Sequence, residues 1–202
     1  MEFREYGPKK GKTVILLHGG GLSWWNYRAE AEQLRGIMGN IASELPSDFE
    51  TIGAAIGEVN TRFNITGDEL QDLSSQFLKF SQLNKTDVST SVDTVQKALS
   101  AYGLGAEDAS AFLDRLNLVG QQTGVSVDKL ANGIVQNGAA FQELGLSIDD
   151  AASFMGQLEK SGANTETVMS GMRKALKNAA ADGKPLEQAL SELQDAIVNG
   201  TG

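Results

Sequence analysis

The sequence predicts a mainly α-helical protein, built from helix-pair repeats that form a multi-helix bundle or a short solenoid, with one short β-strand near the N-terminus. Three observations support this prediction. From Ile37 onwards apolar residues recur at three- and four-residue spacing. Glycines and capping residues interrupt this pattern at helix-length intervals. Two stretches of the second half also match each other at a shift of 42 residues.

The distribution of charge divides the chain into parts of different character. Residues 1–35 hold six basic and four acidic side chains, whereas residues 36–202 hold 11 basic and 22 acidic ones. We therefore expect three regions: a leader over 1–35, an irregular helical connector over 36–65, and a helical repeat domain over 66–202.

The leader contains the predicted strand. The apolar run Thr13–Leu17 leads into His18, Gly19, Gly20 and Gly21, and a helix is expected over 25–34. This strand, loop and helix resemble the start of an α/β-hydrolase of the esterase or lipase kind. The resemblance implies that the backbone N–H groups of Gly19 to Gly21 form a vestigial oxyanion loop.

The rest of a hydrolase site is missing from the sequence. No Gly-x-Ser triplet is followed by the glycine of a nucleophile turn, and His18, the only histidine, already belongs to the loop. We expect no enzyme activity and no catalytic residue. An unpaired strand leaves its edges unsatisfied, so 13–17 is expected either to be disordered or to form a homo-oligomer by pairing with a second copy. A natural fusion and an assembly accident would both give such a leader.

The connector, 36–65, has a less regular pattern. Pro46 interrupts it, and the apolar residues on either side fit two short helices or one kinked helix. Beyond it, Thr66 and Glu69 are spaced as a capping box. Helices are then expected over 68–83, 87–102, 106–121, 127–143, 148–161, 165–180 and 185–198.

The internal repeat is the sharpest pattern in the sequence. A shift of 42 residues places 103–123 on 145–165 with eight identities in 21 positions. Without a gap, Leu130 then falls on Met172 and Ile134 on Leu176, so each unit is read as a helix pair. A weaker third copy is expected to begin near Phe77, with Asp87-Val88-Ser89 in the place of Gly124-Val125-Ser126. Such repeats favour scaffolding or binding over catalysis.

Composition argues against several classes of ligand. The net charge of −9 opposes nucleic acid and anionic membrane surfaces, and the longest apolar run is too short to span a bilayer. There is no cysteine. Glu107-Asp108 and Asp149-Asp150 are expected to cap helices, because neighbouring carboxylates in one turn do not form a coordination set. Met155, Met169 and Met172 are expected in the core. We expect no metal and no cofactor.

Several segments resemble the core region of tail tape-measure proteins of long-tailed bacteriophages. They are Phe63–Leu70, Phe77–Phe80, Thr123–Ala131 and above all Phe141–Ala151. The resemblance covers about residues 40–202. It implies a structural role in tail assembly and length determination, partners among the tail tube and tail assembly chaperone proteins, and a location in the virion tail, or in the host cytoplasm during assembly. The chain would be a fragment of a whole family member. The alternatives are an esterase fragment and a helical protein-binding adaptor.

Overall fold

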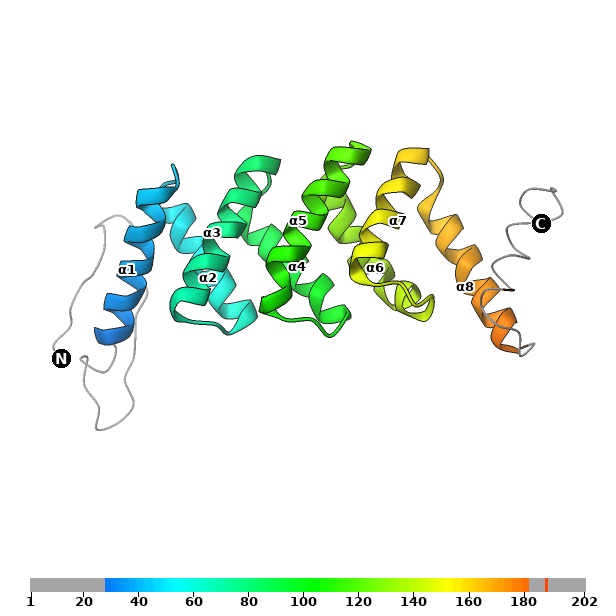
Figure 1. The fold of residues 1–202 in the computed structure, drawn as a ribbon, viewed down its shortest axis with the longest axis horizontal. Coiled ribbons are helices and arrows are strands. Elements are labelled where there is room, and N and C mark those ends of the chain that lie inside the picture. The colour runs from blue at the N-terminus through cyan, green and yellow to red at the C-terminus, as the bar shows by residue number, and fades with distance from the viewer. Residues whose placement is uncertain (1–27, 182–187, 189–202) are drawn as a thin grey trace. The chain divides into compact units, whose positions relative to one another are not determined.

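The computed structural model describes residues 28–181 and residue 188, and its regular elements in that part of the chain are eight α-helices (Figure 1). They are α1 (Arg28–Glu44), α2 (Phe49–Phe63), α3 (Gly67–Asn84), α4 (Val88–Ala101), α5 (Ala106–Thr123), α6 (Val127–Glu143), α7 (Ile148–Ser161) and α8 (Thr165–Ala181). The mainly helical class is therefore confirmed. The predicted strand 13–17 and helix 185–198 lie outside the described residues, apart from Gln188.

The helices belong to two compact units, divided after Val92 within α4. In the first unit, α3 packs against both α1 and α2. Its core contains Ile52, Val59, Leu70 and Phe77, all of which are almost fully buried. Burial of each such side chain contributes about 1.5–3 kcal/mol, which is what holds these amphipathic helices together.

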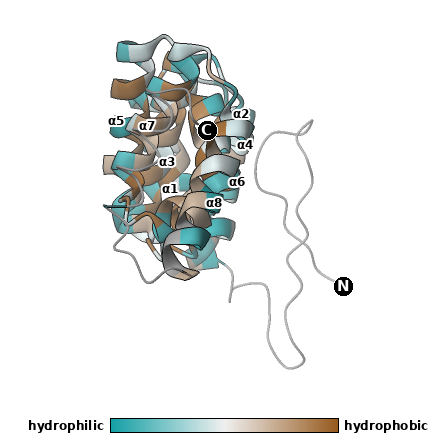
Figure 2. Cartoon of the chain, turned by 90° about the vertical axis from the view of Figure 1, so that its right-hand side faces the viewer, coloured by the Kyte–Doolittle hydropathy of each residue, from teal (hydrophilic) through white to brown (hydrophobic). Residues whose placement is uncertain are grey.

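The second unit contains the rest of α4 and α5 to α8. Within it α7 packs against α5 and α6, and α6 also contacts α8. Leu116, Leu130, Ile134, Phe141 and Met155 form the centre of its core. Hydrophobic and hydrophilic residues alternate along the visible helices, as the predicted periodicity requires (Figure 2).

The helix boundaries at residues 127–143 and 148–161 are those predicted, and the other described helices of the expected repeat domain lie close to their predicted bounds. The expected connector differs. The helix predicted over 25–34 continues to Glu44, because Ile37 and Ile41 extend its buried side past the change in charge at Arg35. Pro46 lies in the loop between α1 and α2, so it separates two regular helices.

The predicted capping box at the start of α3 is wrong. Thr66 is the N-cap, but its side chain makes no capping hydrogen bond. The following residue, Gly67, has a φ of 66°. The residue that follows the N-cap is therefore left-handed. A capping box instead requires helical residues directly after an N-cap in the β region.

The helix pairs repeat at a constant interval over most of the chain. The helices α1, α3 and α5 begin at 28, 67 and 106, and α2, α4 and α6 begin at 49, 88 and 127. We call this interval, from 28 to 67 and from 67 to 106, the regular step. The N-cap Asp87 therefore corresponds to Ser126, which corrects the predicted third copy by two residues.

The distance along the sequence from the start of α5 to the start of α7 includes α6 and the linker after it. The predicted shift, which places 103 on 145, applies only to this step. It arises because α6 has 17 residues where α4 has 14. The next step, from the start of α6 at 127 to the start of α8 at 165, is shorter again, since α7 has 14 residues where α5 has 18. Leu130 thus corresponds to Val168, and the ungapped match to Met172 is wrong. Ile134 corresponds to Met172 rather than to Leu176.

Candidate functional site

The residues that resemble an oxyanion loop, His18, Gly19, Gly20 and Gly21, lie outside the described residues. The described residues instead present a set of recurring contacts that define each helix pair and its turns. These contacts are the candidate functional feature of the chain.

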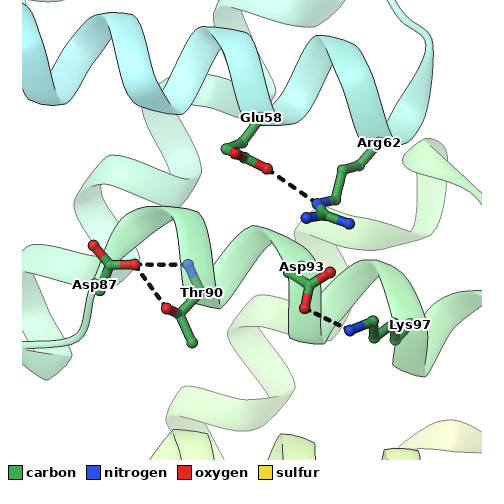
Figure 3. Close-up of polar contacts among 6 residues, drawn as sticks. All are labelled: Glu58, Arg62, Asp87, Thr90, Asp93 and Lys97. Carbon is green, nitrogen blue, oxygen red and sulfur yellow. Dashed lines mark hydrogen bonds and ion pairs between the residues drawn. The ribbon is translucent and has the colours of Figure 1, made fainter.

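The first recurring contact is the N-cap of the second helix in each pair. The side chains of Asp48 and Asp87 accept from the backbone N–H of Thr51 and Thr90, each at 2.8 Å (Figure 3 shows the second). Ser126 accepts from Lys129 N–H at 3.4 Å and Asn164 from Thr167 N–H at 2.8 Å. Each cap satisfies a backbone donor that the helix leaves unpaired.

The two aspartate caps are held in their charged form. Hydrogen bonds from the backbone N–H and hydroxyl of Thr51 lower the pKa of Asp48, and those from Thr90 lower the pKa of Asp87. The charge also complements the N-terminal end of the helix dipole. Ion pairs between residues one turn apart in the same helix also stabilise α2 and α4. Glu58 pairs with Arg62, and Asp93 pairs with Lys97 (Figure 3).

The second recurring feature is a residue in the left-handed conformation at the end of a helix. In the order of the chain these residues are Asn64, Lys85, Gly103, Gly124, Gly145 and Gly162, with φ between 55° and 77°. Glycine adopts this conformation without steric cost, whereas other L-residues do so at a penalty of about 1 kcal/mol. The turn geometry is thus kept even where the residue is unfavourable.

Close helix contacts characterise the second unit. A Cβ placed at Gly156 of α7 would clash with the side chain of Val119 and lie 3.0 Å from Thr123 Cγ2, both on α5. A Cβ at Gly133 of α6 would clash with Met155, whose Sδ would be only 3.3 Å away. Glycine at these positions lets α7 approach both of its neighbours. Met155 and Met169 are buried as predicted, and Met172 is half-buried.

A polar contact joins three helices of the same unit. Glu159, near the end of α7, forms an ion pair with Lys129 of α6 and accepts a hydrogen bond from Thr165 Oγ1 of α8 at 2.7 Å. Its side chain is 14% exposed. The hydrogen bond from Lys129, followed by that from Thr165, lowers the pKa of Glu159. This carboxylate was not singled out from the sequence, because its partners lie on two other helices and no local pattern connects them.

Two of the four predicted capping carboxylates, Asp108 and Asp150, make hydrogen bonds at the start of their helices. Asp108 Oδ2 accepts from Gly105 N–H at 3.2 Å, and Asp150 accepts from the hydroxyl of Ser147 while its own N–H donates to that oxygen. The carbonyl of Asp149 accepts from Arg115 Nε at 3.3 Å. No group of three or more His, Asp or Glu residues able to hold a metal ion occurs among the described residues.

Tyr102 carries a polar group that the fold does not satisfy. Its hydroxyl is buried without a hydrogen-bond partner. Burial, with a smaller effect of the Asp150 carboxylate, raises the pKa of Tyr102 to about 12. Phenylalanine occupies the corresponding positions one regular step before and after it, at Phe63 and Phe141.

No helix in the described part of the chain is long and apolar enough to cross a membrane. The described contacts combine caps, interhelical packing and ion pairs, which position helices on one another.

Searches of curated proteins and of solved structures found no match. The family described as phage-related minor tail protein matches residues 30–201, which include all eight helices apart from the first two residues of α1. The chain therefore belongs to the phage-related minor tail protein family, and its role is a structural one in the phage tail.

Proposed function

We propose that the chain is a helical segment of a tail tape-measure protein, which occupies the lumen of the growing tail tube and takes part in setting the length of the tail. The family match supports a tail protein. The resemblance of segments such as Phe141–Ala151 to tape-measure cores supports the narrower assignment. The observation that carries the proposal is the regular step between helix pairs in a chain of this family.

The proposed partners are the proteins of the tail tube and the tail assembly chaperones. The segment would reach the virion tail after assembly in the host cytoplasm. The net charge of −9 keeps such a chain soluble and self-repelling before it is packaged. We propose no catalytic reaction and no cofactor for it, and the pairing of strand 13–17 between two copies stays a prediction.

A change of chain length tests the proposal. Residues 67–105, one helix pair with its linkers, would be duplicated or deleted in the gene of the phage that encodes the chain, and tails would be measured by electron microscopy. If the pair acts as part of a length determinant, duplication lengthens the tail and deletion shortens it by the same amount. The upper limit is about 60 Å, since a helix rises about 1.5 Å per residue.

The control is Gly57→Ala, a substitution at an exposed helical glycine with no atom near its side-chain position. It should leave tail length unchanged. Tails of unaltered length in both the duplication and the deletion would contradict the tape-measure assignment and favour an adaptor role in the tail.

A further inference from the structure

One side of α8 is less buried by the described residues than the corresponding side of α6. In α6, Leu130, Gly133 and Ile134 are buried, and Gly133 is in close contact with Met155 of α7. When the start of α6 is placed on the start of α8, the corresponding residues are Val168, Gly171 and Met172. All three are only half-buried, and no atom of the described residues lies within 4 Å of the Cβ position at Gly171. Among the residues that the structure describes, no helix packs on this face as α7 packs on α6.

The next stretch of the sequence has the side chains that such a helix needs. The residues of α7 that are buried and larger than glycine are Ile148, Ala151, Ala152 and Met155. Moved by the same interval that separates the starts of α6 and α8, they fall on Leu186, Ala189, Leu190 and Leu193, all of which are apolar.

The ends of this stretch repeat as well. The left-handed glycines at 145 and 162, which precede and end α7, fall on Gly183 and Gly200. Gln188 is helical and exposed, as is Asp150 at the corresponding position. The same interval thus reproduces an apolar face, two glycine ends and an exposed position.

We propose that residues 186–199 of the chain dock on the uncovered face of α8 as a ninth helix of the repeat, in the way that α7 docks on α6. The occupant is a segment of the same molecule, because the linker from Ala181 to Leu186 has the length of the linker from Glu143 to Ile148. The inference is independent of the proposed role in tail length.

The chain has no cysteine, so a designed disulfide can test this docking in the full-length protein. The variant carries Gly171→Cys with Leu193→Cys, which correspond to Gly133 and Met155. The positive control is Gly133→Cys with Met155→Cys, because a Cβ at Gly133 would lie 3.5 Å from Met155 Cγ, the atom whose place the Sγ of a cysteine at 155 would take. The matched negative control is Gly171→Cys with Asp195→Cys, because Asp195 corresponds to the exposed Gln157.

After mild oxidation, we expect the 171/193 pair to form an intramolecular disulfide to the same extent as the positive control, and at least tenfold more than the 171/195 pair. Mass spectrometry and a non-reducing gel provide the readout. Equal yields for 171/193 and 171/195 would overturn the proposal. Disulfides that form only between molecules would also overturn it, because a second copy would then cover α8.

A second measurement does not depend on forming a disulfide. In the single variant Gly171→Cys, the thiol should be alkylated at least tenfold more slowly than in Gly57→Cys, whose position is exposed. Adding Leu190→Asp and Leu193→Asp should restore rapid alkylation at position 171. Equal rates for the two single variants would contradict the proposed cover.

Discussion

The two units of the molecule make the same turns with different residues. In the first unit, Asn64 and Lys85 take the left-handed conformation that ends a helix, whereas the second unit uses Gly103, Gly124, Gly145 and Gly162. The helix starts nevertheless follow the same regular step, from 28 to 67 and from 67 to 106. This repeat is therefore maintained by where helices start and stop, and less by the identity of the residues at those points.

Close packing distinguishes the second unit further. The α7 glycine Gly156 is in contact with α5, and a side chain there has no space. Gly156→Val should therefore destabilise the protein by about 3 kcal/mol, the upper end of the cost of overpacking. Urea denaturation followed by circular dichroism measures this, with Gly57→Val, in the first unit and free of neighbouring atoms, as the control. Equal losses in the two variants would show that α7 and α5 are not in close contact.

The caps of the two units differ in charge, since the first unit uses Asp48 and Asp87 where the second uses Ser126 and Asn164. Asp87→Ala should cost about 1 kcal/mol at pH 7 because it leaves a backbone N–H of α4 without its acceptor. The pKa of Asp87 is lower in the folded state than in the unfolded state, so its contribution is present above the unfolded pKa and is lost as the pH falls through the folded pKa.

Asp87→Asn is the control for that pH dependence, because asparagine keeps the cap but does not titrate. Its stability should change less between pH 5 and pH 2 than that of the wild type. Parallel curves for the wild type and Asp87→Asn would mean that the carboxylate charge does not matter at this cap.

Replacing the left-handed Lys85 with glycine would give the first unit the residue type that ends helices in the second unit. Lys85→Gly should raise the free energy of unfolding by about 1 kcal/mol, since glycine avoids the steric penalty of a φ of 57°. Lys85→Ala, which removes the charge but keeps the Cβ, should give no such gain. A gain of equal size in both variants would assign the effect to charge.

The smallest effect is expected at Tyr102, where the repeat places phenylalanine elsewhere. Tyr102→Phe removes a buried hydroxyl that has no partner, so stability at pH 7 should rise by less than about 1 kcal/mol. The folded-state pKa of about 12 lies above the ordinary value of 10, so wild-type stability is complete below pH 10 and falls between pH 10 and 12. The difference between variant and wild type should grow over that range, and a constant difference would contradict the burial of the phenol.

The sequence allowed most helices to be predicted because their signals are local. Apolar spacing and the glycines after Thr123 and Ser161 define α6 and α8 without knowledge of their neighbours. The regular step was missed for two reasons. Lys85 is not a sequence signal of a helix end, unlike glycine or asparagine, and the greater length of α6 shifts the stretch in which identities are dense. Contacts such as Glu159 with Lys129 depend on distant residues and cannot be read from local patterns.

We infer that a helix pair repeating at the regular step is the structural unit of this chain. Urea denaturation of two deletion variants tests this inference, with one variant lacking 67–105 and the other lacking 67–103. The first keeps the step between helix pairs, because it joins Thr66 to the start of α5, and the second shifts it by two residues. We predict that the deletion of 67–105 retains the helicity per residue and the sigmoidal unfolding of the parent protein, while the deletion of 67–103, which adds two residues to the linker before α5, unfolds at a lower urea concentration. Identical behaviour of the two variants would contradict the claim.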